Sequence, residues 1–375
     1  MLQKDKTYYT YKDLTIVPTC ISNVEHRSEC NPYGNDEMLP LFTAPMDTVV
    51  NKDNFDLFES EGIHAILPRT ESIDDRLNFS KEGRWAAYSL NEFEDFFSVE
   101  NGLFANSSHI KALIDIANGH MLKSFDLVRK SKEVYGDKIS IMVGNIANPT
   151  TYEEYAKVGA DYIRLGIGAG RGCLTTSNLG VHMPMASLVD ETVSVKRTLE
   201  EKGYDNLPKI IADGGIRNYS DIIKALALGA DYVMVGGLFS RMLESAAPKL
   251  CDSHDWYSKV PIHVTLSDLE NMHKDGSSWI GFYRDKKINL GKLKINFYGM
   301  ASKDGQIAMS GKKSKTSEGR SEIMYVAYTM KGWVENMTDY LRSAMSYVGT
   351  KTLEEFKKNA MVIVNSNNAV EVVNK

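Results

Sequence analysis

Cysteine is scarce in this chain, with four among 375 residues, Cys20, Cys30, Cys173 and Cys251. They are too scattered for a disulfide-stabilised domain, and no CxxC or Cys/His spacing indicates structural zinc. Long apolar runs are missing too. The N-terminal residues lack the apolar core of a signal peptide, and no segment approaches the roughly 18 apolar residues that a spanning helix needs. We therefore expect reduced thiols, a cytoplasmic location and no membrane partner.

Basic clusters are also missing. The 44 basic and 49 acidic residues give a net charge of −5, with no long basic run and no basic stripe interleaved with aromatic residues. Nucleic-acid binding depends on such a patch, so we expect no nucleic-acid partner. No GxGxxG motif joins a strand to a helix as in a Rossmann domain, so a dinucleotide would have to bind by other means. The 43% hydrophobic content is that of an ordinary globular protein.

Short apolar runs alternate with segments of helical periodicity, which indicates repeated β-α units. Strands are expected at residues 41–47, 63–69, 84–90, 111–117, 139–145, 162–167, 210–215 and 232–237. Helices are expected at 51–60, 91–98, 121–134, 151–158, 184–202, 219–228 and 334–347, followed by a short tail helix and a strand at 361–364. Eight such units without a break predict a closed α/β barrel, the (β/α)8 or TIM barrel, in a single domain spanning 1–375.

Two segments interrupt this rhythm. Residues 248–296 form a polar and aromatic insertion after the eighth strand. Its histidines and aromatic residues have no fixed spacing, which favours surface hairpins over a metal site; they are His254, Trp256, His263, His273, Trp279 and Tyr283. Residues 303–320 are small, basic and poor in apolar side chains, so we expect a mobile active-site flap.

A glycine-rich loop at residues 166–184 contains Cys173. The glycines before the cysteine remove the Cβ atoms that would hinder a tight turn around a ligand or ion; they are Gly166, Gly168, Gly170 and Gly172. Thr175 follows two residues after the thiol, where a hydroxyl can carry its proton. Two interpretations stand, a covalent nucleophile at Cys173 or a plain turn with a free cysteine.

Other polar candidates follow the predicted strands. The carboxyl ends of barrel strands gather at one face, where the active sites of such barrels lie. The residues at these ends are Asp47, Arg69, Asp115, Asn118 and Asn145. Glycine pairs at 214–215 and 236–237 follow the last two strands and indicate a phosphate site made by backbone N–H groups, although plain turns have the same composition. Asp213 is placed either to bind ribose hydroxyls or to cap the next helix.

Six motifs, in this order, resemble the IMP dehydrogenase and GMP reductase family over nearly the whole chain. They are Pro-Met-Asp-Thr at 45–48, Asp-Ile-Ala-Asn-Gly at 115–119, Gly-Asn-Ile at 144–146, Gly-Ile-Gly-Ala-Gly-Arg-Gly-Cys-Leu-Thr at 166–175, Ile-Ala-Asp-Gly-Gly-Ile-Arg at 211–217 and Phe-Tyr-Gly-Met-Ala-Ser at 297–302. The resemblance implies a (β/α)8 barrel, usually a homotetramer, in which a cysteine attacks C2 of a purine mononucleotide.

The resemblance also implies roles for single residues. Cys173 would be the nucleophile, and Thr175 and Glu318 the proton-transfer pair. The substrate would be held by Asp213 at the ribose, by Gly214, Gly215, Gly236 and Gly237 at the phosphate, and by Gly299, Met300, Ala301, Ser317 and Gly319 at the base. The nicotinamide cofactor would contact Arg69, Asp115, Ile116, Ala117 and Asn118, and a potassium ion the carbonyls of Gly168, Gly170 and Cys173. Apart from the resemblance, the positive charge of Arg171 so close to Cys173 in the sequence favours the thiolate, although family members usually carry Ser or Lys at this position.

Within the family, the sequence is more like bacterial-type GMP reductases, which use NADPH to convert GMP to IMP and ammonia. The alternative is an IMP dehydrogenase, which oxidises IMP to XMP with NAD and activates water with an arginine-tyrosine pair on its flap. This chain has neither Arg nor Tyr between Met300 and Glu318, although Pro45 and Leu174 resemble the dehydrogenases. Alternatives of other classes are a non-catalytic purine-nucleotide sensor and a flavin barrel. The intact set of Cys173, Thr175 and Glu318 speaks against a sensor, and flavin barrels do not need the cysteine loop.

Overall fold

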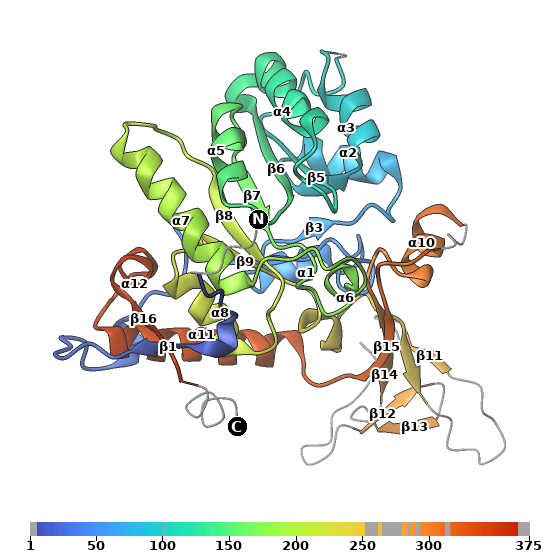
Figure 1. Ribbon diagram of the computed structural model, residues 1–375. Coiled ribbons are helices and arrows are strands. Elements are labelled where there is room, and N and C mark those ends of the chain that lie inside the picture. Colours follow the sequence, from blue (N-terminus) through green and yellow to red (C-terminus); the bar gives the residue numbers. More distant parts are fainter. Residues whose placement is uncertain are drawn as a thin grey trace.

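The computed structural model describes residues 6–100, 102–251, 262–264, 280–283, 286–289, 293–311 and 316–366. Its centre is an eight-stranded parallel sheet in the order β2-β9-β8-β7-β6-β5-β4-β3 (Figure 1). The strands are β2 (Leu41–Thr43), β3 (Ile66–Leu67), β4 (Trp85–Tyr88), β5 (Ile110–Asp115), β6 (Ile139–Ile146), β7 (Tyr162–Leu165), β8 (Lys209–Asp213) and β9 (Tyr232–Val235). Each lies within or next to a predicted strand, so the eight predictions are confirmed.

The sheet closes on itself between its first and last strands. Phe42 of β2 forms a parallel bridge with His64, which lies two residues before β3. The His64 amide donates to the Leu41 carbonyl at 3.0 Å, and the Thr43 amide donates to the His64 carbonyl at 2.9 Å. These bonds satisfy edge groups that an open sheet would leave unpaired, so the predicted (β/α)8 barrel is confirmed.

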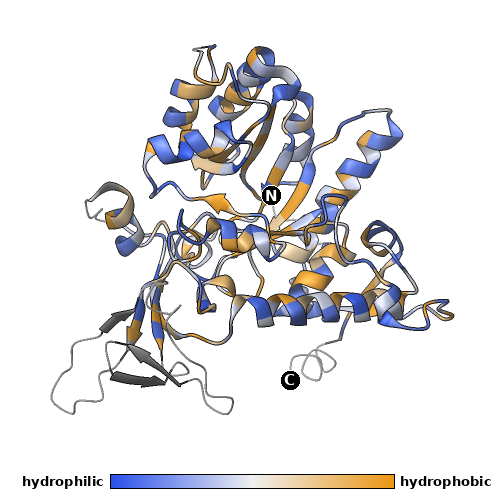
Figure 2. Ribbon diagram, turned by 180° about the vertical axis from the view of Figure 1, so that it is seen from behind, coloured by the Kyte–Doolittle hydropathy of each residue, from blue (hydrophilic) through white to orange (hydrophobic). Residues whose placement is uncertain are grey.

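The barrel interior is packed with side chains. Because successive side chains of a strand point to opposite faces, alternate residues face inward. The buried cluster inside the barrel consists of Phe42, Ala44, Ile66, Trp85, Ala87, Leu113, Met142, Ile211 and Met234. Residues of the other parity pack beneath the surrounding helices, and apolar colour accordingly covers much of the central strands in Figure 2. The barrel is therefore a core that supports a site at one end.

The helices around the sheet are α1 (Phe55–Ser60), α2 (Ile73–Lys81), α3 (Leu90–Phe97), α4 (Leu122–Tyr135), α5 (Thr150–Lys157), α7 (Met185–Glu201), α8 (Tyr219–Ala227) and α11 (Met330–Val348). The last of these closes the ring as predicted, and its buried Trp333 contacts Phe239 and stacks on Tyr219. Helix α2 was not predicted because most of its residues are polar, although Ser72 caps it by accepting the Asp75 amide at 3.1 Å. No helix in the described part of the chain is long and apolar enough to cross a membrane.

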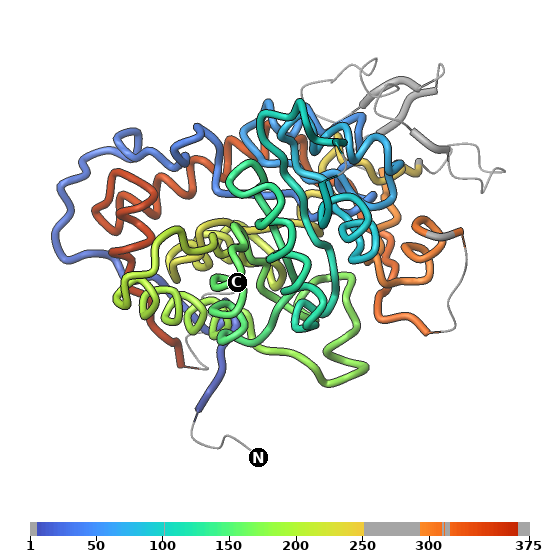
Figure 3. Tube along the Cα trace, turned by 90° about the horizontal axis from the view of Figure 1, so that it is seen from above, coloured from blue at the N-terminus to red at the C-terminus, as the bar shows by residue number. Residues whose placement is uncertain are grey.

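The two ends of the described chain lie together. Strand β1 (Leu14–Val17) pairs antiparallel with β16 (Met361–Val364), which follows the short helix α12 (Leu353–Asn359). Figure 3 shows the N-terminal segment running beside the C-terminal helices, and the Thr19 amide donates there to the Tyr347 carbonyl at 3.0 Å. The tail helix and strand were predicted, but the partner strand at 14–17 was not.

The insertion contributes antiparallel strands beside the barrel (Figure 1). Strands β10 (Lys249–Cys251), β11 (Ile262–Val264), β14 (Lys294–Tyr298) and β15 (Ser321–Tyr325) form one sheet, and β12 (Ile280–Tyr283) pairs with β13 (Lys286–Asn289). Several residues of the predicted histidine and aromatic group lie outside the described residues, namely His254, Trp256, His273 and Trp279. In the predicted flap, residues Lys303–Ser310 form helix α10, residues 312–315 lie outside the described residues, and mobility stays a prediction.

Candidate active site

The Cys173 thiol lies at one end of a chain of hydrogen bonds. The Cys173 amide donates to the Gly170 carbonyl at 3.0 Å, and this hydrogen bond closes a turn just before helix α6 (Thr175–Leu179). The sulfur lies 3.2 Å from Thr175 Oγ1, and Thr175 Oγ1 donates to Glu318 Oε2 at 3.0 Å. The structure thus brings together the three predicted catalytic residues, with the thiol half-buried rather than sequestered in the core. The arrangement can carry a proton between the sulfur and the carboxylate.

Glu318 reaches this site because its backbone is tied to the cysteine loop. The Leu174 amide donates to the Glu318 carbonyl at 2.6 Å, and the Arg320 amide donates to the Gly172 carbonyl at 2.9 Å. Cys173 and Gly319 form an antiparallel bridge between these two bonds. A Cβ at Gly319 would overlap the backbone nitrogen of Ser302, so the close approach requires glycine. This main-chain pairing brings together Thr175 and Glu318, which are 143 positions apart in the sequence.

A cavity of about 210 Å³ opens beside the thiol. Its lining includes Cys173 and eight of the ten predicted substrate residues, namely Asp213, Gly214, Gly215, Gly236, Gly237, Gly299, Met300 and Ala301. The other two lie next to it, since Ser317 Oγ donates to the Ala301 carbonyl at 3.1 Å and Gly319 follows in the same turn. The cavity therefore gathers residues from the ends of β8 and β9, from the cysteine loop and from the segment after β14.

The Gly214–Gly215 turn is pressed against the cysteine loop. A Cβ at Gly214, whose φ is +116°, would lie 2.9 Å from the Ala169 Cβ. The Gly215 amide donates to the Ala169 carbonyl at 3.0 Å, so this N–H group already has a partner inside the protein. The cap of helix α8 is Asn218, whose side chain accepts the Asp221 amide at 3.0 Å. The alternative that Asp213 caps this helix is therefore wrong.

A second group of predicted residues lies at the end of β5. Asp115 accepts a 2.7 Å hydrogen bond from Arg164, and Arg69 Nη1 donates to the Asp115 carbonyl at 3.3 Å. The Arg69 Nε atom is buried and has no hydrogen-bond partner among the residues that the structure describes. Ile116, Ala117 and Asn118 continue the chain from β5 into the following turn, where Asn118 Oδ1 accepts the His120 amide at 3.2 Å. These groups can bind polar parts of a cofactor.

Two of the three carbonyls predicted to bind potassium, those of Gly168 and Gly170, accept hydrogen bonds within the cysteine loop. The Gly168 carbonyl accepts the Thr176 hydroxyl at 2.9 Å, and the Gly170 carbonyl accepts the Cys173 amide. Each carbonyl oxygen has a second lone pair for an ion. The described residues contain no group of three or more His, Cys, Asp or Glu side chains placed to hold a metal, so an ion here would depend on backbone oxygens.

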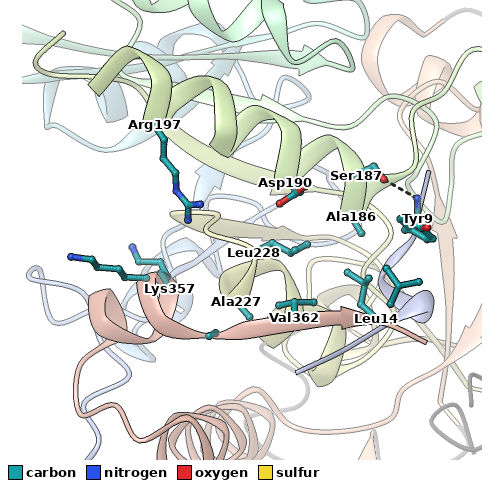
Figure 4. A pocket seen from close by; sticks show the side chains of 13 residues that line it. Tyr9, Leu14, Ala186, Ser187, Asp190, Arg197, Ala227, Leu228, Lys357 and Val362 are labelled. Carbon is teal, nitrogen blue, oxygen red and sulfur yellow. Dashed lines mark hydrogen bonds between the residues drawn. The ribbon is translucent and has the colours of Figure 1, made fainter. Parts of the chain in front are cut away.

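A larger cavity, of about 370 Å³, lies elsewhere on the molecule. Figure 4 shows it between α7, α8 and the β1–β16 strands, with Arg197 and Lys357 on opposite sides. Apolar residues such as Leu228 and Val362 form much of its lining, and none of the three catalytic candidates contacts it. Volume alone therefore does not identify the reactive site here.

Comparison with known proteins gives the same assignment as the motifs. Residues 99–277 match the family model described as IMP dehydrogenase / GMP reductase domain. A GMP reductase of Chromobacterium violaceum is 30% identical over 248 residues, covering 64% of this chain and 75% of that protein. This chain belongs to the IMP dehydrogenase / GMP reductase family. It is also 28% identical to a GMP reductase of Clostridium acetobutylicum over 96% of each chain, and 27% identical to one of Caenorhabditis elegans over 87% of this chain and 80% of that protein.

In this family member, the Arg171 side chain lines the same cavity as Cys173 and is paired with a carboxylate. Its Nε and Nη2 atoms donate to both carboxylate oxygens of Glu322 on β15, at 3.0 and 2.8 Å. The hydrogen bond to Glu322 raises the pKa of Arg171. The guanidinium charge is thus balanced by a carboxylate, and its effect on the Cys173 thiolate stays a prediction.

Sequence reasoning missed two features of this family site. Arg164 is 5% exposed, and it bonds both Asp115 and Asp213, the second of which lines the cavity. A charged residue within an otherwise apolar predicted strand was the available signal. Asp47 was noted only as a strand end, but its Oδ2 accepts the Tyr298 hydroxyl at 2.6 Å. Burial raises the pKa of Asp47, and its Oδ1 is buried without a partner among the described residues.

Proposed function

We propose that this chain is a GMP reductase, an oxidoreductase that converts GMP to IMP and ammonia through a thioimidate on Cys173. The observation that carries the proposal is the hydrogen-bonded chain from Cys173 Sγ through Thr175 to Glu318. The relatives named above are GMP reductases, and this chain covers most of their length. A plain turn or a non-catalytic sensor would need neither the thiol nor its proton path.

The covalent step follows from this chain of hydrogen bonds. Cys173 loses its proton toward Thr175 and Glu318, and the thiolate adds to C2 of GMP. The exocyclic amine then leaves C2 as ammonia, with its proton supplied through the same pair. The carbon–nitrogen bond is thereby exchanged for a carbon–sulfur bond, and a thioimidate remains on Cys173. Using one pair first as base and then as acid needs no further titratable group.

The reduction requires a nicotinamide cofactor, which we propose to be NADPH. When bound, it supplies the hydride that reduces C2. The Cys173 thiolate then leaves C2, and IMP is released. Arg69 and Asp115 would hold it, because the buried Arg69 Nε, which has no partner among the described residues, and the polar end of β5 fit the carbonyl or anionic groups of a dinucleotide. Potassium at the Gly168, Gly170 and Cys173 carbonyls, a homotetramer and a cytoplasmic location belong to the same proposal.

The competing activity is oxidation of IMP to XMP with NAD. That reaction must hydrolyse the thioimidate and therefore needs a base to activate water. The absence of Arg and Tyr between Met300 and Glu318 disfavours it. The test measures NADPH absorbance with GMP and, in parallel, NAD reduction with IMP. NADPH oxidation that depends on GMP and releases ammonia supports the reductase. NAD reduction with IMP, without any GMP-dependent NADPH oxidation, would establish the dehydrogenase.

A further inference from the structure

Arg164 occupies the last inward-facing position of β7. Tyr162, two residues earlier, packs against the cluster inside the barrel, so the alternation of the strand directs Arg164 inward as well. Burial acts to lower the pKa of Arg164, but Asp213 and Asp115 raise it above its ordinary value. A buried guanidinium requires such partners, because an unpaired buried charge is strongly unfavourable.

Arg164 binds two carboxylates, and in each of them only one of the two oxygens accepts hydrogen bonds from the described residues. On Asp213, Arg164 Nη2 and Asn145 Nδ2 both donate to Oδ2, each at 2.8 Å. On Asp115, Arg164 Nη1 donates to Oδ1 at 2.7 Å. Within the described part of the chain, Asp213 Oδ1 and Asp115 Oδ2 accept no hydrogen bond. Each carboxylate therefore has one oxygen committed to the protein and one available to a ligand.

The residue beside Arg164 on the adjacent strand must be glycine, because a larger residue would overlap Arg164. A Cβ at Gly144 on the adjacent strand β6 would lie 2.7 Å from the Arg164 carbonyl oxygen. The guanidinium is planar and has donors on two edges, so one side chain can bond two carboxylates at once. A lysine ammonium at the same place is a point charge that lacks this fork.

We propose that Arg164 is a positioning residue that sets the ribose-binding oxygen of Asp213 and the cofactor-binding oxygen of Asp115 together, and so couples the two ligand sites. This inference rests on the proposed function, since Asp213 and Asp115 face the nucleotide and the nicotinamide cofactor in that assignment. Asp213 lines the cavity beside Cys173. A change at one carboxylate that shifts the Arg164 guanidinium also shifts the other carboxylate, because the same rigid group bonds both.

The test measures dissociation constants by isothermal titration calorimetry for GMP, for 2′,3′-dideoxy-GMP and for NADPH. Arg164→Lys should weaken GMP and NADPH each on the order of tenfold, the size of one charge-assisted hydrogen bond. It should also reduce the preference for GMP over the dideoxy analogue, because Oδ1 of Asp213 no longer points at the hydroxyls. The control Asn145→Ala removes hydrogen bonds to Asp213 and to the Gly166 carbonyl but leaves both Arg164 pairs in place, so it should weaken GMP while NADPH binding stays at the wild-type value.

Asp115→Asn provides a second variant that retains Arg164, in case the lysine variant does not fold, and circular dichroism checks each protein. It should weaken NADPH and also lower the preference for GMP over its dideoxy analogue. A loss confined to NADPH in Asp115→Asn, or equal weakening of GMP and its analogue in Arg164→Lys, overturns the coupling. Failure of the wild-type protein to bind GMP overturns the proposed function together with it, whereas normal GMP binding with Arg164→Lys like wild type overturns this inference alone.

Discussion

Replacing Glu318 with glutamine isolates the proton path from everything else at the site. Glu318 Oε2 accepts the Thr175 hydroxyl at 3.0 Å, and Thr175 is in turn 3.2 Å from the Cys173 sulfur. A glutamine side chain can keep the hydrogen bond through its carbonyl oxygen, but it cannot take up or release a proton at pH 7. The backbone bond from the Leu174 amide to the Glu318 carbonyl is untouched, so the segment should stay in place.

The expected loss follows from the role of the pair. General acid–base catalysis contributes a factor of roughly 10² to 10⁴, or about 3–5 kcal/mol of barrier. We expect kcat for GMP-dependent NADPH oxidation to fall by at least about 100-fold, with the dissociation constant for GMP nearly unchanged. Rapid-quench measurement of ammonia in a single turnover should show that the deamination step has slowed.

The matched control is Glu322→Gln, which removes the same charge four residues along the chain but breaks only the pair with Arg171. It should keep kcat within roughly threefold of wild type, as expected for a substitution away from the proton path. If Glu318→Gln also stays within that range while GMP still binds, Glu318 does not transfer the proton and the reasoning from the hydrogen-bonded chain is wrong.

Three further predictions concern the nucleophile, the backbone around it and the stability of the barrel. Cys173→Ala should abolish turnover yet retain GMP binding, and measurable GMP-dependent NADPH oxidation would rule out the covalent route. Gly319→Ala should reduce activity on the order of 100-fold by pushing Ser302 away from the cysteine loop; unchanged kinetics would mean that this contact is not needed. Burial raises the pKa of Glu92, but hydrogen bonds from Arg76 and from the Ser89 amide outweigh it and lower the pKa to about 2. Glu92→Gln should therefore reduce the free energy of unfolding at pH 7 by about 1–2 kcal/mol, allowing for solvent screening. The deficit relative to wild type should shrink as the pH falls from 4.5 toward about 2, and urea melts with the same deficit at every pH would contradict this assignment.

The barrel was predictable because its signals are local. Apolar runs of strand length, such as Ile139–Ile146, alternate with helical periods, and eight repeats leave few topologies other than a closed barrel. Elements with weak local signals were missed. Helix α2 is largely polar. Strand β1 has only four residues, which suit a strand but form too short a run to assign, and its partner β16 lies 344 or more residues further along the chain.

The site divides in the same way. The sequence by itself determined which residues carry chemistry, because the motifs around Cys173, Asp213 and Glu318 are contiguous and specific. Only the tertiary structure decided how they act together, since hydrogen bonds between distant strands place Glu318 on Thr175, turn Arg171 toward Glu322 and put Arg164 between two carboxylates. The physical reason is that residue type fixes what a side chain can donate, accept or attack, whereas charge balance and donor geometry depend on neighbours that the linear order does not specify.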